Sequence, residues 1–302
     1  MQRVALPDLI SRTNELAALP TSVVRILELL DDITVGADRV LTVIDKDPAL
    51  TANLLKLCNS AYYAMPRKIG NTREALILLG NKTVLTLAFA SSMGNIMRGP
   101  LLGYGLGREQ LWQHALATAL AASYLASETR IHELSDRAFT AGLLHDIGKL
   151  LLNDLLTEQV DQLPRSTQTL DDLGSDAGPR ISAPVSAVNL RQAEHDILGF
   201  DHCQAGAALT EAWQFPDMLS LAIRHHHEPV DCGEDGILVR VVYAANQVAK
   251  GLGLGGFSPA PISTDDLRAL TDLGIPHAAI VHLLDHLSED VGNLLNTVVR
   301  TR

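Results

Sequence analysis

The chain has 302 residues, and 24 Lys and Arg against 35 Asp and Glu give it a formal net charge of −11. That length supports either one large domain or two packed lobes. Hydrophobic residues make up 47% and charged residues 20%, a globular composition that excludes a disordered chain. The acidic balance excludes a general nucleic-acid binder, which needs a basic face to neutralise phosphates.

Two features bear on location. Residues 1–11 do not read as a secretory signal peptide, because Arg3, Pro7 and Asp8 interrupt them. Residues 110–127 are uncharged but contain polar side chains such as His114, so we expect a buried core helix there and no membrane span. We therefore predict a soluble, cytoplasmic protein without membrane association.

The three cysteines, Cys58, Cys203 and Cys232, lie far apart in the sequence. Their odd number and wide spacing exclude a disulfide framework and a Cys-x-x-Cys metal knuckle, and they fit a reducing compartment. The simplest prediction is that they serve as small apolar side chains.

Leu and Ala dominate and β-branched runs are sparse, so helices are expected along the whole chain. Asp47 followed by Pro48 is an N-cap with proline at the first helical position. Asn71 and Glu74 have the spacing of a capping box and predict the next helix. Residues 83–97 continue as an apolar helical run.

Glycines cluster in residues 99–107, which we interpret as the boundary between two lobes. An Ala-rich helix is predicted over residues 108–127, and another begins at Ser135 and breaks at Gly148. Residues 163–184 are rich in Pro, Gly, Ser, Thr and Asp and predict a loop. Further helices are expected around residue 193 and over residues 205–213, 216–225 and 238–250.

The C-terminal segment has the most regular pattern. After Pro276, apolar residues recur in steps of four and three, at Ile280, Leu284, Leu287, Val291, Leu294 and Val298. This pattern predicts a helix with one apolar stripe. The stripe packs either on the parent domain, which we favour, or on a second copy of the chain in a homodimer. With no convincing strand pattern, the predicted fold is all-α.

Several histidines lie at the ends of predicted helices or inside helices that are otherwise apolar. His114 lies inside the Ala-rich helix, His145 and Asp146 precede Gly148, and His202 and the run 225–227 come later. Neutral imidazoles and a carboxylate converging from several helices suit a divalent transition metal. Such an ion lowers the pKa of bound water and can produce a hydroxide nucleophile.

Residues 141–149, Ala-Gly-Leu-Leu-His-Asp-Ile-Gly-Lys, resemble the signature of the HD superfamily of metal-dependent phosphohydrolases. The first part of the chain is similar to HDOD proteins, bacterial signalling relatives of the HD-GYP phosphodiesterases. The residues that carry this similarity are Leu19-Pro20, Asp45 to Leu50, Asn59-Ser60-Ala61, Ala75 to Gly80, Glu194, Gly199, His202, Gly206, Trp213, Pro216 and His226 to Pro229.

The resemblance implies residue roles. His114, His145 and Asp146 match the first three metal-binding positions of the HD pattern. The additional ligands of a binuclear site resemble His202, His226 and His227. Lys149 lies where active relatives place a lysine near the substrate phosphate, so Asp146 and Lys149 would be catalytic if the protein is an enzyme. The implied cofactor is one or two divalent ions of Fe, Mn, Ni or Zn.

The sequence also departs from the pattern. Asn246 stands where the HD pattern ends in Asp, and a neutral amide binds a transition metal weakly. After Glu228 the chain reads Pro-Val-Asp-Cys-Gly, so the Gly-Tyr-Pro element is missing. We therefore favour a regulatory HDOD module that is non-catalytic or weakly catalytic, with an unidentified signalling protein or a small nucleotide ligand as its partner. The alternative is a metal-dependent phosphohydrolase acting on a nucleotide or cyclic dinucleotide.

For several of these residues a purely structural role remains the alternative. His145 and Asp146 could be a structural pair, and Lys149 a surface lysine. His282 and His286 are expected on a solvated helix face. For the domains, the resemblance implies a first lobe over residues 1–105, an HD-like lobe over residues 106–255, and a helical extension over residues 256–302 that packs on the HD-like lobe.

Overall fold

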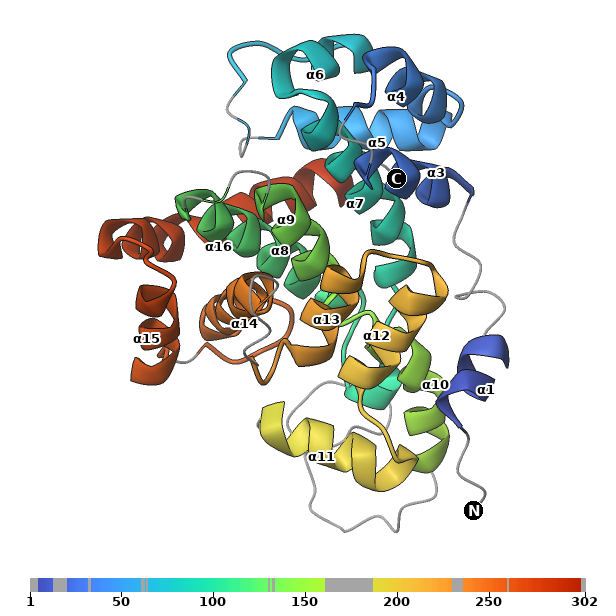
Figure 1. The fold of residues 1–302 in the computed structure, drawn as a ribbon, viewed down its shortest axis with the longest axis vertical. Coiled ribbons are helices and arrows are strands. Elements are labelled where there is room, and N and C mark those ends of the chain that lie inside the picture. Colours follow the sequence, from blue (N-terminus) through green and yellow to red (C-terminus); the bar gives the residue numbers. More distant parts are fainter. Residues whose placement is uncertain are drawn as a thin grey trace.

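The chain folds into helices arranged as two packed lobes. The structure, a computed structural model, describes residues 5–12, 21–31, 34–60, 63, 65–129, 131, 134–160, 187–229, 236–259 and 261–299. Within these ranges there is no strand, and one isolated antiparallel bridge joins Leu101 to Leu106. The prediction of an all-α fold with two packed lobes is confirmed (Figure 1).

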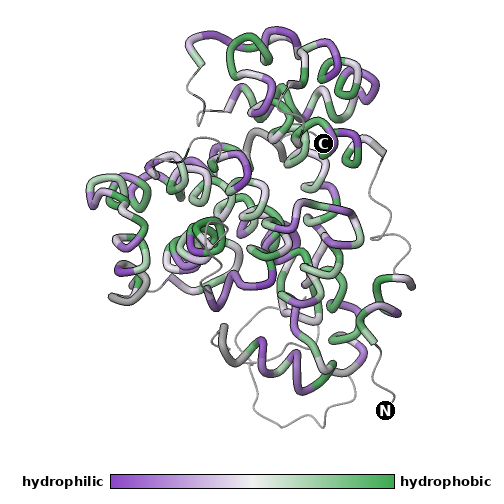
Figure 2. The backbone as a smooth tube through the Cα atoms, viewed as in Figure 1, coloured by the Kyte–Doolittle hydropathy of each residue, from purple (hydrophilic) through white to green (hydrophobic). Residues whose placement is uncertain are grey.

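Among the described residues, the first lobe contains α3 (Thr21–Asp31), α4 (Ala37–Ile44), α5 (Pro48–Cys58) and α6 (Thr72–Leu79) near the top of Figure 1, and α7 (Asn81–Met97), which runs from there toward the second lobe. Along α4 and α6, hydrophobic and hydrophilic residues alternate, as helices with one buried face require (Figure 2). Helix α7 is buried on all sides instead, since it packs on α3 and α5 within this lobe and on α9 of the second lobe.

Both predicted helix starts in the first lobe are confirmed. The Asp47 side chain accepts a hydrogen bond from the backbone N–H of Leu50 at 3.0 Å. Asn71 accepts one from the N–H of Glu74 at 2.8 Å. The second half of the expected capping box is displaced by one residue, because the Glu74 carboxylate accepts from the N–H of Gly70.

The second lobe is built around α8. Its members are α8 (Gln110–Glu128), α9 (Leu134–Leu144), α10 (Gly148–Val160), α11 (Ala187–Leu198), α12 (His202–Ala212), α13 (Asp217–His225) and α14 (Gly236–Gly251). A short 3-10 helix, η2 (Leu102–Tyr104), leads into this lobe and packs on α10. Helix α8 contacts α9 and α14, and its small alanines let those helices approach closely. Within the described residues, no helix combines the length and the apolar run needed to cross a bilayer.

Three helices connect the lobes or extend them. The predicted C-terminal helix is α16 (His277–Val299), which follows α15 (Thr264–Asp272) and contacts both α8 and α5. At the other end, α1 (Leu6–Arg12) packs on α12 (Figure 1). The predicted loop over residues 163–184 and the side chain of Cys232 lie outside the described residues.

Candidate metal centre

His145 and Asp146 lie in a tight turn between two helices. Helix α9 ends at Leu144 and a new helix, α10, begins at Gly148, where the sequence predicted only a break. The turn is closed by hydrogen bonds from the N–H of Ile147 to the Leu144 carbonyl and from the N–H of Lys149 to the Asp146 carbonyl. Both side chains are thereby presented to the interior, where they are at most 1% exposed.

Gly148 lets α10 and α12 touch at their N-termini. A Cβ atom at this position would collide with the carbonyl oxygen of His202 and lie 2.6 Å from the nitrogen of Gly206. Only glycine allows so close an approach of two backbones. The contact places His202, the first residue of α12, directly beside Asp146.

One side of the Asp146 carboxylate faces a first group of imidazoles. Its Oδ2 lies 3.4 Å from Nε2 of His145 and 3.7 Å from Nε2 of His114. The two Nε2 atoms are 3.2 Å apart, and Nε2 of His114 also lies 3.1 Å from Oδ1 of Asn246. We call His114, His145, Asn246 and Oδ2 of Asp146 the first half-site.

The other carboxylate oxygen faces a second group. Oδ1 of Asp146 lies 3.3 Å from Nε2 of His202 and 3.5 Å from Nε2 of His226. Nε2 of His227 lies 3.1 Å from Nε2 of His202. We call His202, His226, His227 and Oδ1 of Asp146 the second half-site. All the ligand positions implied by the sequence are therefore brought together, with Asp146 between the two groups.

The imidazoles are oriented by hydrogen bonds on their far sides. Nδ1 of His145 donates to the Gly142 carbonyl at 2.7 Å, and Nδ1 of His226 donates to the Ile223 carbonyl at 2.7 Å. Because a neutral imidazole carries one proton, these bonds leave the Nε2 lone pairs directed toward the carboxylate of Asp146. A cation located among these lone pairs and the carboxylate would satisfy them.

Glu194 and Tyr104 support His202 from behind. The Glu194 carboxylate accepts hydrogen bonds from Nδ1 of His202 at 2.7 Å, from the backbone N–H of His202 at 3.0 Å, and from the Tyr104 hydroxyl at 2.8 Å. Glu194 therefore both bonds across the site and satisfies the start of α12. Burial raises the pKa of Glu194, but His202 outweighs it and the net shift is downward.

Lys149 is not a surface lysine. Its Nζ lies 2.6 Å from Oδ2 of Asp146, and the residue is only 5% exposed. Burial disfavours the Asp146 carboxylate, but Lys149 and His145 outweigh it and hold the pKa of Asp146 well below its usual range. The ammonium thus neutralises the side of the carboxylate that faces the first half-site.

The imidazoles of the centre differ in their proton affinity. Burial lowers the pKa of His145 to about 4, although Asp146 opposes this, and it also lowers the pKa of His114. Burial acts in the same direction on His202, but Cys203 and Glu194 outweigh it and raise the pKa of His202 to about 10. The second half-site is itself uneven, because burial, together with the charge of His226, lowers the pKa of His227.

The residues present fit a metal ion. Oδ1 of Asp146 is buried without a hydrogen-bond partner, and so are Nδ1 of His114 and Nδ2 of Asn246. Within the described residues, two groups of ligand atoms lie within 4.8 Å of one another: His114, His145 and Asp146, and His202, Cys203, His226 and His227. An unpartnered buried carboxylate oxygen among imidazoles is the feature that a divalent cation would satisfy.

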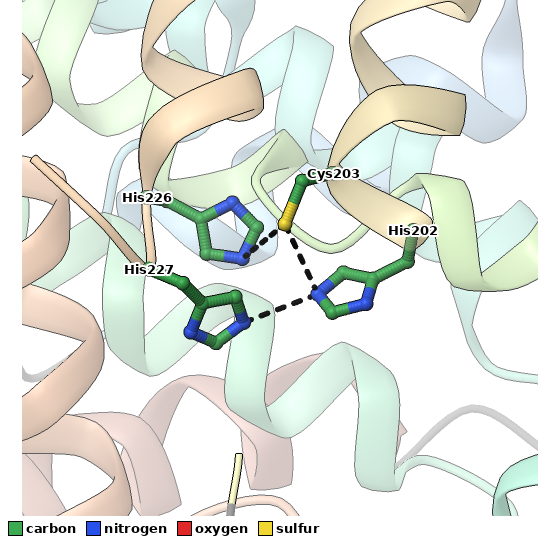
Figure 3. A group of neighbouring side chains, drawn as sticks. All are labelled: His202, Cys203, His226 and His227. Atoms are coloured by element: carbon green, nitrogen blue, oxygen red, sulfur yellow. Dashed lines mark hydrogen bonds between the residues drawn. The ribbon is translucent and has the colours of Figure 1, made fainter. Parts of the chain in front are cut away.

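Cys203 is the member of this cluster that the sequence analysis missed. Its Sγ lies 3.6 Å from Nε2 of His202 and 4.0 Å from Nε2 of His226 (Figure 3). Burial raises the pKa of the thiol, but the two histidines outweigh it and lower the pKa to about 6. The one available signal was its position directly after His202. Cys58, buried in the first lobe, fits the prediction of an apolar filler.

A glycine-containing turn after α14 covers the first half-site. A Cβ at Gly255 would collide with Cβ of His114, so this turn lies directly on α8. Gly255 has a φ of +85°, which favours glycine as well. The ring of Phe257 then lies 4.8 Å from the His114 ring, centroid to centroid. The sequence analysis singled out neither residue.

Other histidines lie outside this centre. His225, at the end of α13, is half-buried and contributes no contact to either half-site. His282 and His286 are exposed on α16, with ring centroids 4.2 Å apart. Their exposure agrees with the prediction of a solvated face.

Sequence comparisons identify related proteins. The sequence profile of the HDOD domain matches residues 16–229. An uncharacterised protein of Treponema pallidum (strain Nichols) is 25% identical over 223 residues, which make up 72% of this chain and 38% of that protein. The chain thus spans well under half the length of that curated relative.

Solved structures share the helical fold. An HDOD domain protein of unknown function from Geobacter sulfurreducens has a TM-score of 0.76 and 23% identity, with 97% of both chains covered. A Marinobacter aquaeolei VT8 protein, provisionally named a signal transduction protein, has a TM-score of 0.72 and 23% identity over 97% of this chain and 64% of that one. A Shewanella amazonensis SB2B protein, provisionally named a phosphohydrolase, has a TM-score of 0.66 and 22% identity over 96% and 98% of the two chains.

Proposed function

This chain belongs to the HDOD domain family, and from that premise we propose that it is a regulatory module of bacterial signal transduction whose second lobe binds a divalent metal ion without turning over a substrate. The observation that carries the proposal is the burial of most of the centre: His145, His202 and His226 are each 0% exposed, and His227 is partly exposed. A catalytic metal keeps an open position for water and substrate, whereas a structural metal has a closed coordination shell. The covering Phe257 adds to this closure.

Two further contacts argue against turnover. A hydrolase would need Lys149 near the substrate phosphate, yet its Nζ already pairs with Asp146 at 2.6 Å. Asn246 supplies an amide oxygen where the HD pattern has a carboxylate, so the first half-site carries less negative charge. Both features reduce the attraction of the first half-site for a second ion.

The metal would be held by His114, His145, Asp146, His202, His226 and His227, with Asn246 as a weak ligand. Fe, Mn, Ni or Zn, as one or two ions, fits this donor set. When bound, the ion would supply positive charge that holds together α8, α12 and α14, the turn between α9 and α10, and the residues after α13. We place the protein in the cytoplasm, with a signalling protein or a small nucleotide as its partner. Residues 1–105, 106–255 and 256–302 would be its two lobes and C-terminal extension.

One observation favours a second candidate, a metal-dependent phosphohydrolase acting on a nucleotide or cyclic dinucleotide. Asp146 directs one oxygen to each half-site, and a carboxylate between two groups of imidazoles is the arrangement that holds two metal ions. In that case Asp146 would be a ligand to both ions and Lys149 would turn toward the substrate phosphate. Lys149 would have to leave its present ion pair to do so.

The experiment combines metal content with turnover. We expect elemental analysis to find metal in the wild type, none in His226→Ala, and the wild-type amount in His282→Ala, which removes an exposed histidine instead. After incubation with Mn²⁺, Fe²⁺, Ni²⁺ or Zn²⁺, the protein should not hydrolyse cyclic or linear nucleotides. Turnover that is lost in Asp146→Ala would overturn the regulatory proposal in favour of the hydrolase.

A further inference from the structure

Cys203 lies among the imidazoles of the second half-site, buried to 1% exposure. Its Sγ and the Nε2 atoms of His202, His226 and His227 converge on one volume (Figure 3). These atoms come from only two places in the fold, the first turn of α12 and the residues that follow α13. Apolar packing alone does not require the sulfur to lie beside two imidazole nitrogens.

We propose that Cys203 is a metal ligand, and that its thiolate completes a Cys-His₃ zinc site with His202, His226 and His227. The inference rests on the proposed metal centre and goes beyond it, because it names the half-site that is filled first and the metal that fills it. Metal binding would displace the thiol proton to solvent.

Three of the distances between these ligand atoms lie close to those of such a site, and all the atoms lie within 4.8 Å of one another. With metal–nitrogen bonds of about 2.0 Å and metal–sulfur bonds of about 2.3 Å, a tetrahedral site requires nitrogens about 3.3 Å apart and sulfur about 3.5 Å from each nitrogen. The Nε2 atoms of His202 and His227 are 3.1 Å apart. Sγ lies 3.6 Å from Nε2 of His202 and 4.0 Å from Nε2 of His226.

Charge favours the same half-site. In the first half-site, Oδ2 of Asp146 is already paired with Lys149, and Asn246 is neutral. In the second, Oδ1 of Asp146 has no hydrogen-bond partner. A thiolate adds a full negative charge there, and thiolate ligands select Zn²⁺ over Mg²⁺, Ca²⁺ and Mn²⁺.

The start of α12 holds the thiol and the first imidazole in place. Asp201 caps this helix through a reciprocal pair of bonds with Gln204, and Arg191 donates to Asp201 at 2.8 Å. Glu194 fixes the far nitrogen of His202. Ligands whose outer partners are fixed in this way lose little conformational entropy when a metal binds.

Co²⁺ reports a thiolate ligand directly, because cobalt bound to sulfur gives a charge-transfer band in the near ultraviolet. We expect wild-type protein, stripped of metal and titrated with Co²⁺, to bind one tight equivalent and to show this band. In Cys203→Ser the band should vanish. The affinity for Co²⁺ should fall at least about tenfold, because removing even a residue that hydrogen-bonds to a metal ligand lowers metal affinity by that much. His282→Ala, on the exposed face of α16, should keep both the band and the ion.

A chain with Cys58→Ser and Cys232→Ser serves as the matched control and retains Cys203 as its one cysteine. A band in this variant can come only from Cys203, so it decides the matter even if Cys203→Ser fails to fold. Bound Co²⁺ without a charge-transfer band would overturn the role of Cys203 and leave the proposed metal centre standing. Absence of any tight Co²⁺ binding would overturn both.

Discussion

Asp146 and Lys149 form an ion pair inside the second lobe, with 2.6 Å between Oδ2 and Nζ and at most 5% of either residue exposed. The pair lies one helical turn apart at the start of α10, so it is made locally as soon as that helix forms. Its position gives the two half-sites unequal charge. The Lys149 ammonium neutralises the Oδ2 side of the carboxylate, and a metal ion would neutralise the Oδ1 side in the same way.

Replacing Lys149 tests this inequality. In metal-free Lys149→Met, Asp146 keeps its buried charge without the ammonium, and the free energy of unfolding should fall by about 3–5 kcal/mol. Metal affinity should rise, since Oδ2 is released. Lys46→Met removes an exposed lysine from the first lobe and should change stability by less than about 0.5 kcal/mol. Urea denaturation with and without Zn²⁺ measures both effects, and equal stabilities of the two metal-free variants would contradict the prediction.

Gly148→Ala tests the contact between α10 and α12. The added Cβ would collide with the His202 carbonyl, so we expect a loss of at least about 3 kcal/mol and a lower metal content. Gly292, within α16, has no atom within 4 Å of its virtual Cβ. Gly292→Ala should therefore stabilise the protein by roughly 0.5–1 kcal/mol. Chemical denaturation compares the two, and a neutral Gly148→Ala would show that the helices need not touch.

Asn246→Asp should strengthen the first half-site. The new carboxylate would replace an amide oxygen that lies 3.1 Å from Nε2 of His114, and a charged oxygen attracts a divalent cation more strongly. We expect the metal content per chain to rise in elemental analysis. Gln247→Glu adds the same charge at the next, half-buried position and should leave the metal content unchanged. An equal rise in both variants would point to a general charge effect instead.

Cys58 should make stability fall at alkaline pH. Burial raises the pKa of its thiol from 9.0 to about 12. The unfolded chain therefore loses this proton above pH 9 while the folded protein keeps it, so stability declines as pH rises from 9 toward 12. The slope from this group is about 1.4 kcal/mol per pH unit. Cys58→Ala removes it, and urea denaturation of both proteins at several alkaline pH values should show their stabilities converging; parallel curves would contradict the assignment.

Much of the fold was predictable from local signals. Caps such as Asp47 and Asn71 act through bonds to residues three positions away, so sequence spacing suffices to predict them. The resemblance to HDOD proteins is confirmed by the match over residues 16–229. The ligand positions that the resemblance implies do lie together, with Asp146 between the two groups.

The remaining features depend on tertiary contacts that no spacing reveals. The burial of Lys149 follows from the neighbours of α10, and its position after a helix break indicated only a surface site. Cys203 contacts the centre because α12 begins at His202 and therefore presents two consecutive side chains to it. Phe257 reaches His114 through glycines with positive φ, whose path the sequence does not specify.

The contact of α16 with both α8 and α5 has a consequence for the order of folding during synthesis. Residues 277–299 leave the ribosome after both lobes have been made, so neither lobe has this cover while translation proceeds. The apolar strip on α8 that α16 later covers must stay exposed or be shielded by chaperones until then. Docking of α16 therefore adds a second connection between the lobes to the one that α7 makes with α9.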